Sequence, residues 1–311
     1  MKQFTMKSAL FAAALMLIFF SCGGSKEKYT LEYNLNAGDV FEQSMVVDMK
    51  INQNMMGQSM DIGTSIQMDA LYNINAVQDE TIDFNYSIEL MKMDMNMGEM
   101  NFSFSSDTED EFATPTNMGP MLKSVTKIPF NMIIDKRGNV QSITGLEKIM
   151  ESMVNAFDDT IDEATKQQMI AQFEQQFGAE SMQSNFNQSL TAFPENPVKI
   201  GESWKSSTKI NSGMVKMEMD TKTTLKSVKG DIAILETKGN ISTGDTPIEQ
   251  AVNGMEMRMN IKGTQTGTSE IDLKTGWMLK SEIVQDLTCE TEVQGMKIPQ
   301  NITSTITIYR K

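Results

Sequence analysis

Apolar and polar residues alternate along most of this chain. Such alternation is typical of antiparallel strands in a sheet that has one solvent-exposed face and one covered face. The clearest runs cover residues 45–51, 66–74, 82–90 and 302–308. We therefore expect strands through most of the chain, grouped in an N-terminal β-rich half at 29–143 and a C-terminal β-rich half at 194–311.

Residues 144–193 break this alternation, because their apolar residues recur at three- and four-residue steps, the period of an amphipathic helix. The first helix carries Leu146, Ile149, Met150, Met153, Val154 and Phe157. Thr144 and Glu147 have the spacing of a capping box at its start. Further helices are expected over 169–177 and 182–193. Their apolar faces must be buried, and the sheet is the available partner.

The two β-rich halves share a turn motif, in which a glycine and an acidic residue precede an aromatic residue that opens a strand. The two copies consist of Gly38, Asp39 and Phe41, and of Gly201, Glu202 and Trp204. A second pair of similar turns lies at 134–138 and 271–276. The predicted fold class is therefore α+β. Two related antiparallel β halves form a curved sheet or half-open barrel, with a helical segment at about 145–193 packed on its concave side.

Two polar stretches, 105–120 and 239–254, are expected to be loops. The first contains an acidic run at 107–111, and residues 94–98 contain a fragment of a calcium-loop spacing. The fragment lacks the third ligand and the distal glutamate of an EF-hand. We therefore expect a solvated acidic surface there, and no metal site.

The chain begins with two lysines and an apolar run at 9–20. This run is too short to span a bilayer comfortably but fits a secretory signal peptide. A serine, Cys22 and a Gly/Ser stretch follow, a pattern that resembles the cleavage site of bacterial lipoproteins, whose cysteine becomes the acylated N-terminus. It predicts a signal peptide at 1–21, lipidation of Cys22 and a tether at 22–28. An ordinary signal peptide that contains a cysteine is the alternative.

Histidine is absent from the sequence, which removes Ser-His-Asp and Cys-His catalysis and the common zinc sites. Neither a P-loop nor a Gly-x-Gly-x-x-Gly or Gly-x-Ser-x-Gly motif occurs. Cys289 lies in an alternating stretch without basic neighbours, so we expect a small buried residue and not a reactive thiol. We expect no catalytic residues, cofactor or metal. Hydrolysis by paired carboxylates is the enzymatic alternative.

The formal net charge of −14 argues against nucleic-acid binding, which rests on neutralisation of phosphates by Lys and Arg. It argues equally against electrostatic docking on anionic lipid. Attachment to the membrane is therefore expected from the acyl chains on Cys22, which include palmitate-like chains.

The chain contains 29 methionines, and many of them cluster. The candidate ligand-binding residues are Met91, Met93, Met95, Met97, Met217, Met219, Met255, Met257 and Met259. Three interpretations are open: ordinary core residues, a flexible apolar groove, or a soft-metal site for Cu(I) or Ag(I). Residues 82–90 place apolar side chains at even positions, and residues 91–97 place them at odd positions. Either a β-bulge intervenes or both faces of the strand are covered.

With its lipoprotein-like start and these turn motifs, the chain resembles a group of uncharacterised lipoproteins of Bacteroidota, which form a domain family of unknown function. The resemblance spans nearly all of residues 29–311 and brings no known catalytic residues. More distantly, strands wrapped around helices resemble the LolA- and LppX-like lipoprotein carriers. In that family a half-open barrel holds acyl chains, so the resemblance implies lipid binding at the level of the fold.

The sequence therefore predicts a non-enzymatic lipoprotein of the bacterial cell envelope, lipid-anchored at the outer membrane on its periplasmic or surface face. We expect it to bind an apolar ligand, a lipid or acyl chain, between the sheet and the helices. The alternative is a structural or adaptor lipoprotein that presents a surface or a sheet edge to an envelope protein.

Overall fold

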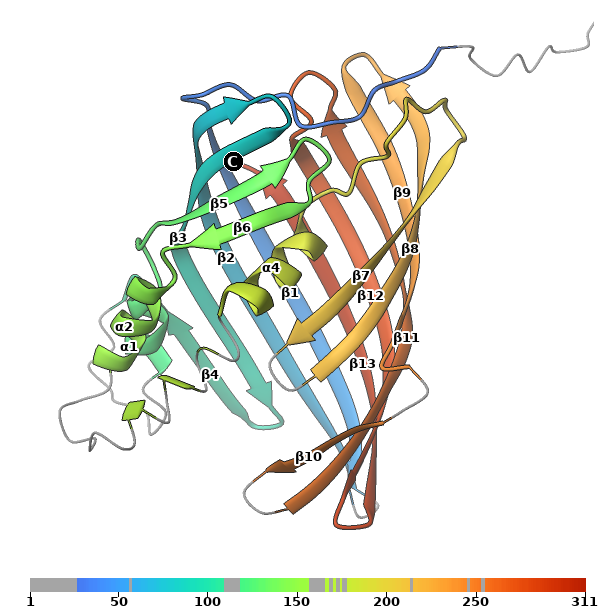
Figure 1. Cartoon of the computed structure of the whole chain (residues 1–311). Coiled ribbons are helices and arrows are strands. Elements are labelled where there is room, and N and C mark those ends of the chain that lie inside the picture. Colours follow the sequence, from blue (N-terminus) through green and yellow to red (C-terminus); the bar gives the residue numbers. More distant parts are fainter. Residues whose placement is uncertain are drawn as a thin grey trace, which may run out of the picture.

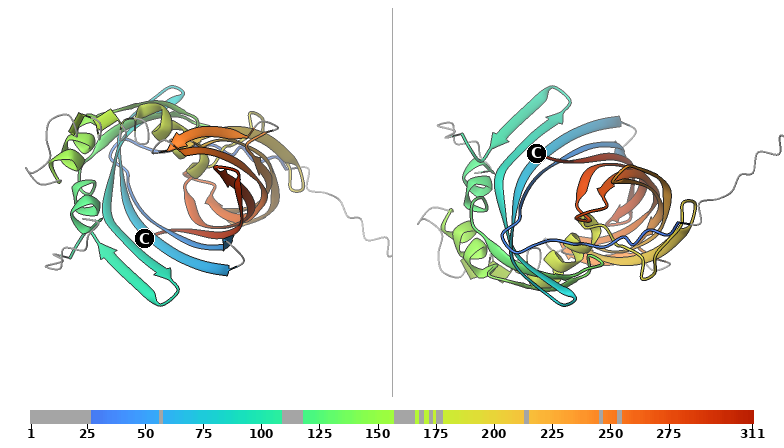
Figure 2. Two further views of the ribbon diagram at one scale, coloured as in Figure 1. Left: turned by 90° about the horizontal axis from the view of Figure 1, so that it is seen from below. Right: turned by 90° about the horizontal axis from the view of Figure 1, so that it is seen from above.

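The computed structural model describes residues 27–55, 58–108, 118–156, 166–167, 170–171, 174, 178–212, 215–244, 247–252 and 255–311. Within these residues, thirteen strands form one antiparallel sheet that is open and strongly curved, and three helices lie beside it (Figure 1). Seen along its long axis, the sheet curls round into a ring-like outline, with helices gathered on one side (Figure 2). The predicted α+β class with a curved sheet is confirmed.

The N-terminal half contributes an antiparallel arrangement in which most consecutive strands pair. Its strands are β1 (Val40–Met55), β2 (Gln58–Gln78), β3 (Thr81–Met97), β4 (Met100–Ser105), β5 (Phe130–Asp135) and β6 (Val140–Thr144). The spatial order is β6-β5-β3-β2-β1, and β4 forms a hairpin with β3 beside the path.

The C-terminal half repeats this arrangement. Its strands are β7 (Ser203–Ser212), β8 (Val215–Lys229), β9 (Ile232–Ser242), β10 (Ile248–Val252), β11 (Met255–Asp272), β12 (Met278–Val293) and β13 (Met296–Arg310). The order continues as β13-β12-β11-β9-β8-β7, with β10 paired to β11. The halves join where β1 pairs with β13, from Gln43 opposite Arg310 to Gln53 opposite Gln300.

The duplicated turns adopt the same conformation in the two halves. Gly38 has a φ of 91° and Gly201 a φ of 90°, in the left-handed region that favours glycine. The acidic residue after each glycine accepts a hydrogen bond from the backbone N–H three residues earlier. The distances are 2.8 Å for Asp39 and 2.9 Å for Glu202. The sequence motif therefore marks equivalent entries into β1 and β7.

The three described helices are α1 (Met118–Ser124), α2 (Glu147–Asn155) and α4 (Ala179–Ser189). The predicted capping box at the start of α2 is wrong, because the N-cap is Leu146 and makes no side-chain cap bond. Thr144 belongs to β6, where it pairs with Asn131, and Gly145 turns the chain with a φ of 89°. Strand pairing therefore holds Thr144 away from the helix.

The third predicted helix is shorter than the period suggested. α4 ends at Ser189, and Leu190 is already extended, with a ψ of 148°. Phe193 is buried in the following irregular segment, where its N–H donates to the carbonyl of Arg137. The second predicted helix, at 169–177, lies largely outside the described residues.

The two predicted loops are only partly loops. At 239–254 the prediction is wrong for most positions, because β9 continues to Ser242 and β10 occupies Ile248–Val252. Polar residues fit a strand whose face meets water, and Gly239 fits where two strands approach closely. A Cβ on Gly239 would lie 2.9 Å from the carbonyl oxygen of Asp220. In the other stretch, β4 ends at Ser105 and α1 begins at Met118, and the residues between 109 and 117 lie outside the described part.

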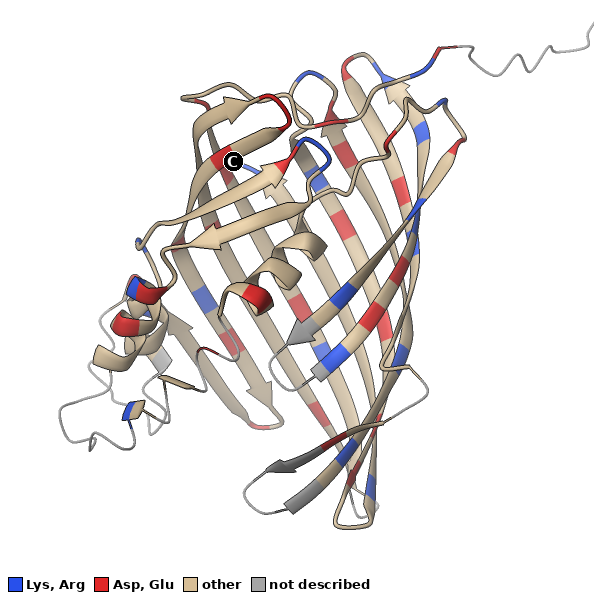
Figure 3. Cartoon of the chain, viewed as in Figure 1, with Lys and Arg blue, Asp and Glu red and all other residues tan. Residues whose placement is uncertain are grey.

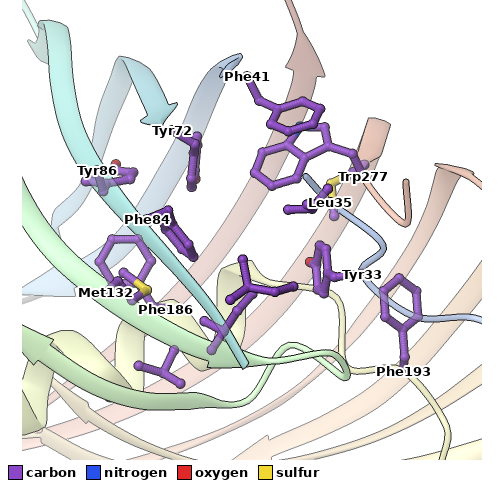
Figure 4. Close-up of a cluster of buried hydrophobic side chains, with 14 of the residues drawn as sticks. Tyr33, Leu35, Phe41, Tyr72, Phe84, Tyr86, Met132, Phe186, Phe193 and Trp277 are labelled. Carbon is purple, nitrogen blue, oxygen red and sulfur yellow. The ribbon is translucent and has the colours of Figure 1, made fainter. Parts of the chain in front are cut away.

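One hydrophobic core joins the two halves at one end of the sheet. The N-terminal segment crosses this end, with Leu31, Tyr33 and Leu35 buried (Figure 1). Phe41 from the first half stacks on Trp277 from the second, with ring centroids 4.3 Å apart (Figure 4). The halves are therefore not separate domains at this end, since their aromatic side chains fill the same space.

The end strands β6 and β7 are connected through α4, which packs against both. The side chain of Gln183 donates to the carbonyl oxygen of Val140 at 2.7 Å, and Asn187 accepts from the N–H of Val140 at 2.9 Å. On the other side, the hydroxyl of Ser184 donates to the carbonyl oxygen of Lys209 at 2.5 Å. Side chains thus satisfy edge groups that a neighbouring strand satisfies elsewhere in the sheet.

Candidate functional site

A cavity of about 410 Å³ lies between β1–β3 and the three helices. Its volume falls within the roughly 300–1,000 Å³ of small-molecule sites. Eight methionines line it, four from strands and four from helices: Met45, Met68, Met91 and Met93, and Met121, Met150, Met153 and Met182. Lys, Arg, Asp and Glu do not occur among the described lining residues. The site is therefore an apolar chamber without fixed charge.

A β-bulge in β3 builds the strand wall of this cavity. Asp69 of β2 pairs with Leu90, but Ala70 pairs with Ile88, so Glu89 is an extra residue in β3. The bulge reverses the alternation of β3, and Met91 therefore lies on the same face as Ile88. Both residues line the cavity. Of the two explanations for the change of phase, the bulge is confirmed.

The methionines of the strand wall lie in register. Met45 of β1 pairs with Met68 of β2, and Met68 pairs with Met91 of β3, which gives a row of three thioethers across three strands. Met93 follows one step further along β3. Unbranched thioether side chains repack at little cost, so this wall can follow ligands of varied shape.

Two of the polar side chains that line the cavity, Tyr72 and Tyr86, belong to the aromatic core, and the others are Gln43 on β1 and Asn185 and Ser189 on α4. The hydroxyl of Tyr72 donates to Oε1 of Gln43 at 3.3 Å, and the hydroxyl of Tyr86 donates to the sulfur of Met68 at 3.8 Å. Burial raises the pKa of both tyrosines well above the usual value of 10.0. Both hydroxyls are therefore neutral hydrogen-bonding groups at physiological pH.

The other predicted methionines are dispersed. Met95 and Met97 lie further along β3, opposite Phe102 and Met100 of β4. Met217 and Met219 pack in a small cluster of their own, together with Ile210 and Ile241. Met255, Met257 and Met259 lie on β11, where the side chain of Met255 is outside the described part. Of the candidates, the structure brings Met91 and Met93 to the cavity, and Cys22 lies outside the described residues.

Most of the cavity was not predicted from the sequence. Met45 and Met68 were visible only as members of alternating strands. Met150 and Met153 were visible on the apolar face of a predicted helix. Tyr72 and Tyr86 were likewise visible only as members of alternating strands, and Gln43 gave no signal. Nothing in the sequence shows that three strands and a later helix enclose one space. Met121 belongs to a seven-residue helix, too short to show a period.

A second hollow, of about 740 Å³, lies beside Gly63 on the lower part of β1–β4. It is lined mainly by polar side chains that alternate with the methionines, among them Asp48, Lys50, Asp94 and Asn96. Figure 3 shows acidic and basic positions interspersed along the strands, with neither sign gathered into one patch. Nothing in this mixture of groups selects a particular ligand.

The remaining candidate groups are Cys289 and the acidic side chains. Cys289 is buried, as predicted, with its sulfur 3.4 Å from the hydroxyl oxygen of Thr291. Among the described residues, no three or more of His, Cys, Asp and Glu are placed to hold a metal ion. Among the same residues, no helix has the length and apolar character to cross a membrane.

Residues 78–278, well over half of the chain, match the model of a family described as "Family of unknown function (DUF6263)". The chain belongs to DUF6263. This confirms the expected membership of a family of unknown function. A search of curated proteins gave no match for the DUF6263 chain.

Among solved structures, the DUF6263 chain is similar to that of lipovitellin, described as "Lipid-protein interactions in lipovitellin". The TM-score is 0.51 at 8% identity, over 89% of this chain and 25% of that one. The chain thus spans about a quarter of the lipovitellin chain, and the likeness shows the fold alone. An outer membrane channel from Pseudomonas putida F1 matches at a TM-score of 0.24 and 6% identity, over 90% of this chain and 97% of that one. That score is too low to support an argument.

Proposed function

We propose that the protein binds a lipid, with an acyl chain held in the cavity between β1–β3 and the helices. The observation that carries the proposal is the composition of the cavity wall, which combines eight methionines with other apolar side chains and no charge. A solid seam between sheet and helices would have excluded this function. Because thioethers adapt their shape, the wall suits flexible chains better than one rigid ligand.

The size of the cavity suits one chain. If a methylene group needs about the volume of a water molecule in the liquid, roughly 30 Å³, the cavity holds on the order of 14 such groups. Each methylene buried contributes about 0.8 kcal/mol. The cost of association, about 4 kcal/mol or more, and the cost of ordering the chain then limit the dissociation constant to micromolar order or weaker.

The similarity to lipovitellin supports the proposal at the level of the fold. That structure concerns lipid–protein interactions, and 89% of the present chain aligns with part of it. Because one fold can serve several functions, the proposal rests on the cavity, and the similarity in fold is secondary support.

We further propose that the protein is a non-enzymatic envelope lipoprotein, with a signal peptide at 1–21, acylated Cys22 and a tether at 22–28. The N-terminal sequence and its likeness to lipoproteins of Bacteroidota support this part. Replacement of Cys22 by serine is expected to release the protein from the membrane fraction, and mass spectrometry of the N-terminal peptide should show the acyl chains. An unmodified Cys22 in the mature protein would refute the anchor.

The cavity is tested by native mass spectrometry of the purified protein, with lipid analysis of an organic extract. We expect an added mass that extracts as a lipid. Ala70 lines the cavity, and the variant Ala70→Leu fills part of it. Ala76→Leu on the same strand is the matched control, since Ala76 does not line the cavity. Loss of the added mass in Ala70→Leu and its retention in Ala76→Leu support the proposal. A clean mass that stays unchanged after incubation with lipid vesicles would overturn it.

A second candidate function is that of an adaptor that contacts an envelope protein. The observation in its favour is a group of exposed apolar residues at the end of the sheet remote from the N-terminal segment. It comprises Met60, Met100, Phe102 and Met296, which are 36–56% exposed. Met100 and Phe102 lie on β4, which pairs only with β3 among the described strands. Crosslinking from position 100 in cells tests this function, with position 50 on β1 as the control. Equal crosslinking at the two positions would refute it.

A further inference from the structure

We propose that the ligand is an uncharged lipid, such as a long-chain alcohol or ester, and that Gln43, Tyr72 and Tyr86 hold its one polar group. This inference rests on the proposed function, because it names the class of lipid that the same cavity accepts. It follows from three observations on the described lining: the lack of charge, the pairing of the Tyr86 hydroxyl and the position of the polar groups.

The lack of charge excludes a buried ionic head group. A carboxylate or phosphate that leaves water needs a cation or several strong donors in return. The cavity wall offers no Lys or Arg side chain among its described residues. A hydroxyl or an ester carbonyl needs only hydrogen bonds, and the cavity can supply these. An uncharged polar group is therefore the one that can enter together with its chain.

The hydroxyl of Tyr86 is available to such a group. The Tyr86 side chain is 2% exposed, and the partner of its hydroxyl in the structure is the sulfur of Met68, a weak acceptor, at 3.8 Å. A hydroxyl oxygen is the stronger acceptor for the same O–H. Since a buried polar group without a good partner costs stability, an oxygen atom of the ligand at this position satisfies the hydroxyl of Tyr86.

Three of the polar lining residues, Gln43, Tyr72 and Tyr86, lie on neighbouring strands, and the other two, Asn185 and Ser189, lie on α4. Tyr72 and Tyr86 are cross-strand partners on β2 and β3, with ring centroids 5.0 Å apart (Figure 4). Gln43 accepts the hydrogen bond from Tyr72, and its side-chain amide also carries two N–H donors. The row of Met45, Met68 and Met91 crosses the same three strands two residues beyond Gln43. The ligand is therefore oriented, with its oxygen at the tyrosines and its chain along the methionines.

A cationic side chain, that of Arg310, lies near Gln43. Arg310 of β13 pairs across the strands with Gln43, and its guanidinium lies 5.2 Å from the ring centroid of Phe41. Arg310 is exposed and does not line the cavity. If it instead held a carboxylate at the cavity mouth, fatty acids would be preferred and the preference would depend on Arg310.

The test compares hexadecanol, methyl palmitate and palmitate, which share one chain length, at slightly alkaline pH on the purified protein. We expect the two uncharged ligands to bind about tenfold more tightly than palmitate, the effect of about one unmatched strong hydrogen bond. Tyr86→Phe and Gln43→Leu should each weaken hexadecanol binding by several-fold. Tyr86→Phe should leave the thermal midpoint of unfolding nearly unchanged, whereas Gln43→Leu should lower it, because the buried hydroxyl of Tyr72 loses its acceptor. Tyr33→Phe, a buried tyrosine outside the cavity, is the matched control and should leave binding as it is.

The outcomes separate the two proposals. If none of the three ligands binds, the proposed lipid-binding function fails. If all bind with equal affinity, or if palmitate binds most tightly and Arg310→Gln removes that advantage, the lipid-binding function stands and the inference of an uncharged ligand fails. Retention of the preference for hexadecanol in both Tyr86→Phe and Gln43→Leu would overturn the assigned residues.

Discussion

Ile88 and Met91 project from β3 into the same cavity, although they are an odd number of residues apart along the strand. In a regular strand such residues lie on opposite faces. The extra residue Glu89 reverses the alternation between them. Met91 and Met93 therefore line the cavity because of one residue.

Deletion of Glu89 is expected to remove the bulge and to leave the pairing on both sides of it unchanged, with Leu90 opposite Asp69 and Met91 opposite Met68. Met91 and Met93 should therefore stay on the cavity face, and the variant should retain the bound lipid. Native mass spectrometry measures the bound lipid, and urea unfolding shows whether the variant is folded. Glu89→Ala, which keeps the residue count and the bulge, is the control and should also retain the lipid. Loss of the lipid from a folded deletion variant would contradict the assigned register.

Asp69 is expected to make stability depend on acid pH. Burial raises the pKa of Asp69, but the hydrogen bond from Lys311 at 2.5 Å, those from Ser44 and Gln67 and the charge of Lys311 together lower it below 3.8. Since the pKa is depressed in the folded state, the stabilisation is present above the ordinary value and is lost as pH falls through the folded one.

The variant Lys311→Met tests this pair. It should lower the free energy of unfolding by about 1 kcal/mol near neutral pH, a modest value because the Lys311 side chain is 38% exposed. The difference from the original protein should shrink as Asp69 becomes protonated below about pH 4. Lys297→Met, at the exposed start of β13, is the control. A difference that stays constant from neutral to acid pH would contradict the assignment.

The buried tyrosines are expected to make stability depend on alkaline pH. Burial raises the pKa of Tyr33 to about 12, against a smaller opposing effect of its hydrogen bonds with Thr191. An unfolded tyrosine releases its proton near 10, so the stabilisation from Tyr33 is full below that pH and is lost as pH rises toward 12.

Tyr33→Phe should therefore show a shallower loss of stability between these two pH values, in urea unfolding experiments. Near neutral pH it should cost about 1 kcal/mol, because the backbone N–H of Thr191 loses its acceptor at 3.1 Å. Tyr309→Phe, at an exposed position, is the control and should leave the alkaline slope unchanged. Identical slopes for Tyr33→Phe and the original protein would refute the prediction.

The contact between α4 and β6 is expected to weaken when one side chain is removed. Asn187→Ala removes the acceptor of the Val140 N–H, so hydrogen exchange of that amide should become about tenfold faster. Gln188→Ala is the control, since the Gln188 side chain donates to Ser184 within the same helix. Unchanged exchange at Val140 in Asn187→Ala would mean that another group protects this edge.

The sequence allowed prediction of what depends on local pattern. Alternation located the strands, and the change of phase after Leu90 led to the bulge as one of two explanations. The turns at Gly38 and Gly201 were predictable because few residues other than glycine adopt their backbone conformation. Thr144 shows the limit of such rules, since its pairing in β6 overrides its capping spacing.

The cavity depends on which helices pack on which face of the sheet. The local pattern of apolar and polar residues carries no information about this tertiary arrangement. Met217 and Met219 alternate in the same way as Met91 and Met93, yet they pack in a separate cluster. What distinguishes the two pairs is the neighbourhood, because α1, α2 and α4 cover β1–β3 and leave a space there. Tyr86 was likewise not predicted as a cavity residue, because its place there depends on its contact with Met68 and on the helices that pack opposite it.

The duplicated halves meet at two junctions of unequal strength. At β1 and β13 a continuous backbone ladder joins them, whereas at β6 and β7 the side chains of α4 bridge the gap. The first junction is thus held by backbone hydrogen bonds and the second by side chains of one helix. If the protein binds a lipid, as proposed, the position of α4 would limit the size of the largest guest, because α4 lines the cavity and side-chain hydrogen bonds hold it to the strands.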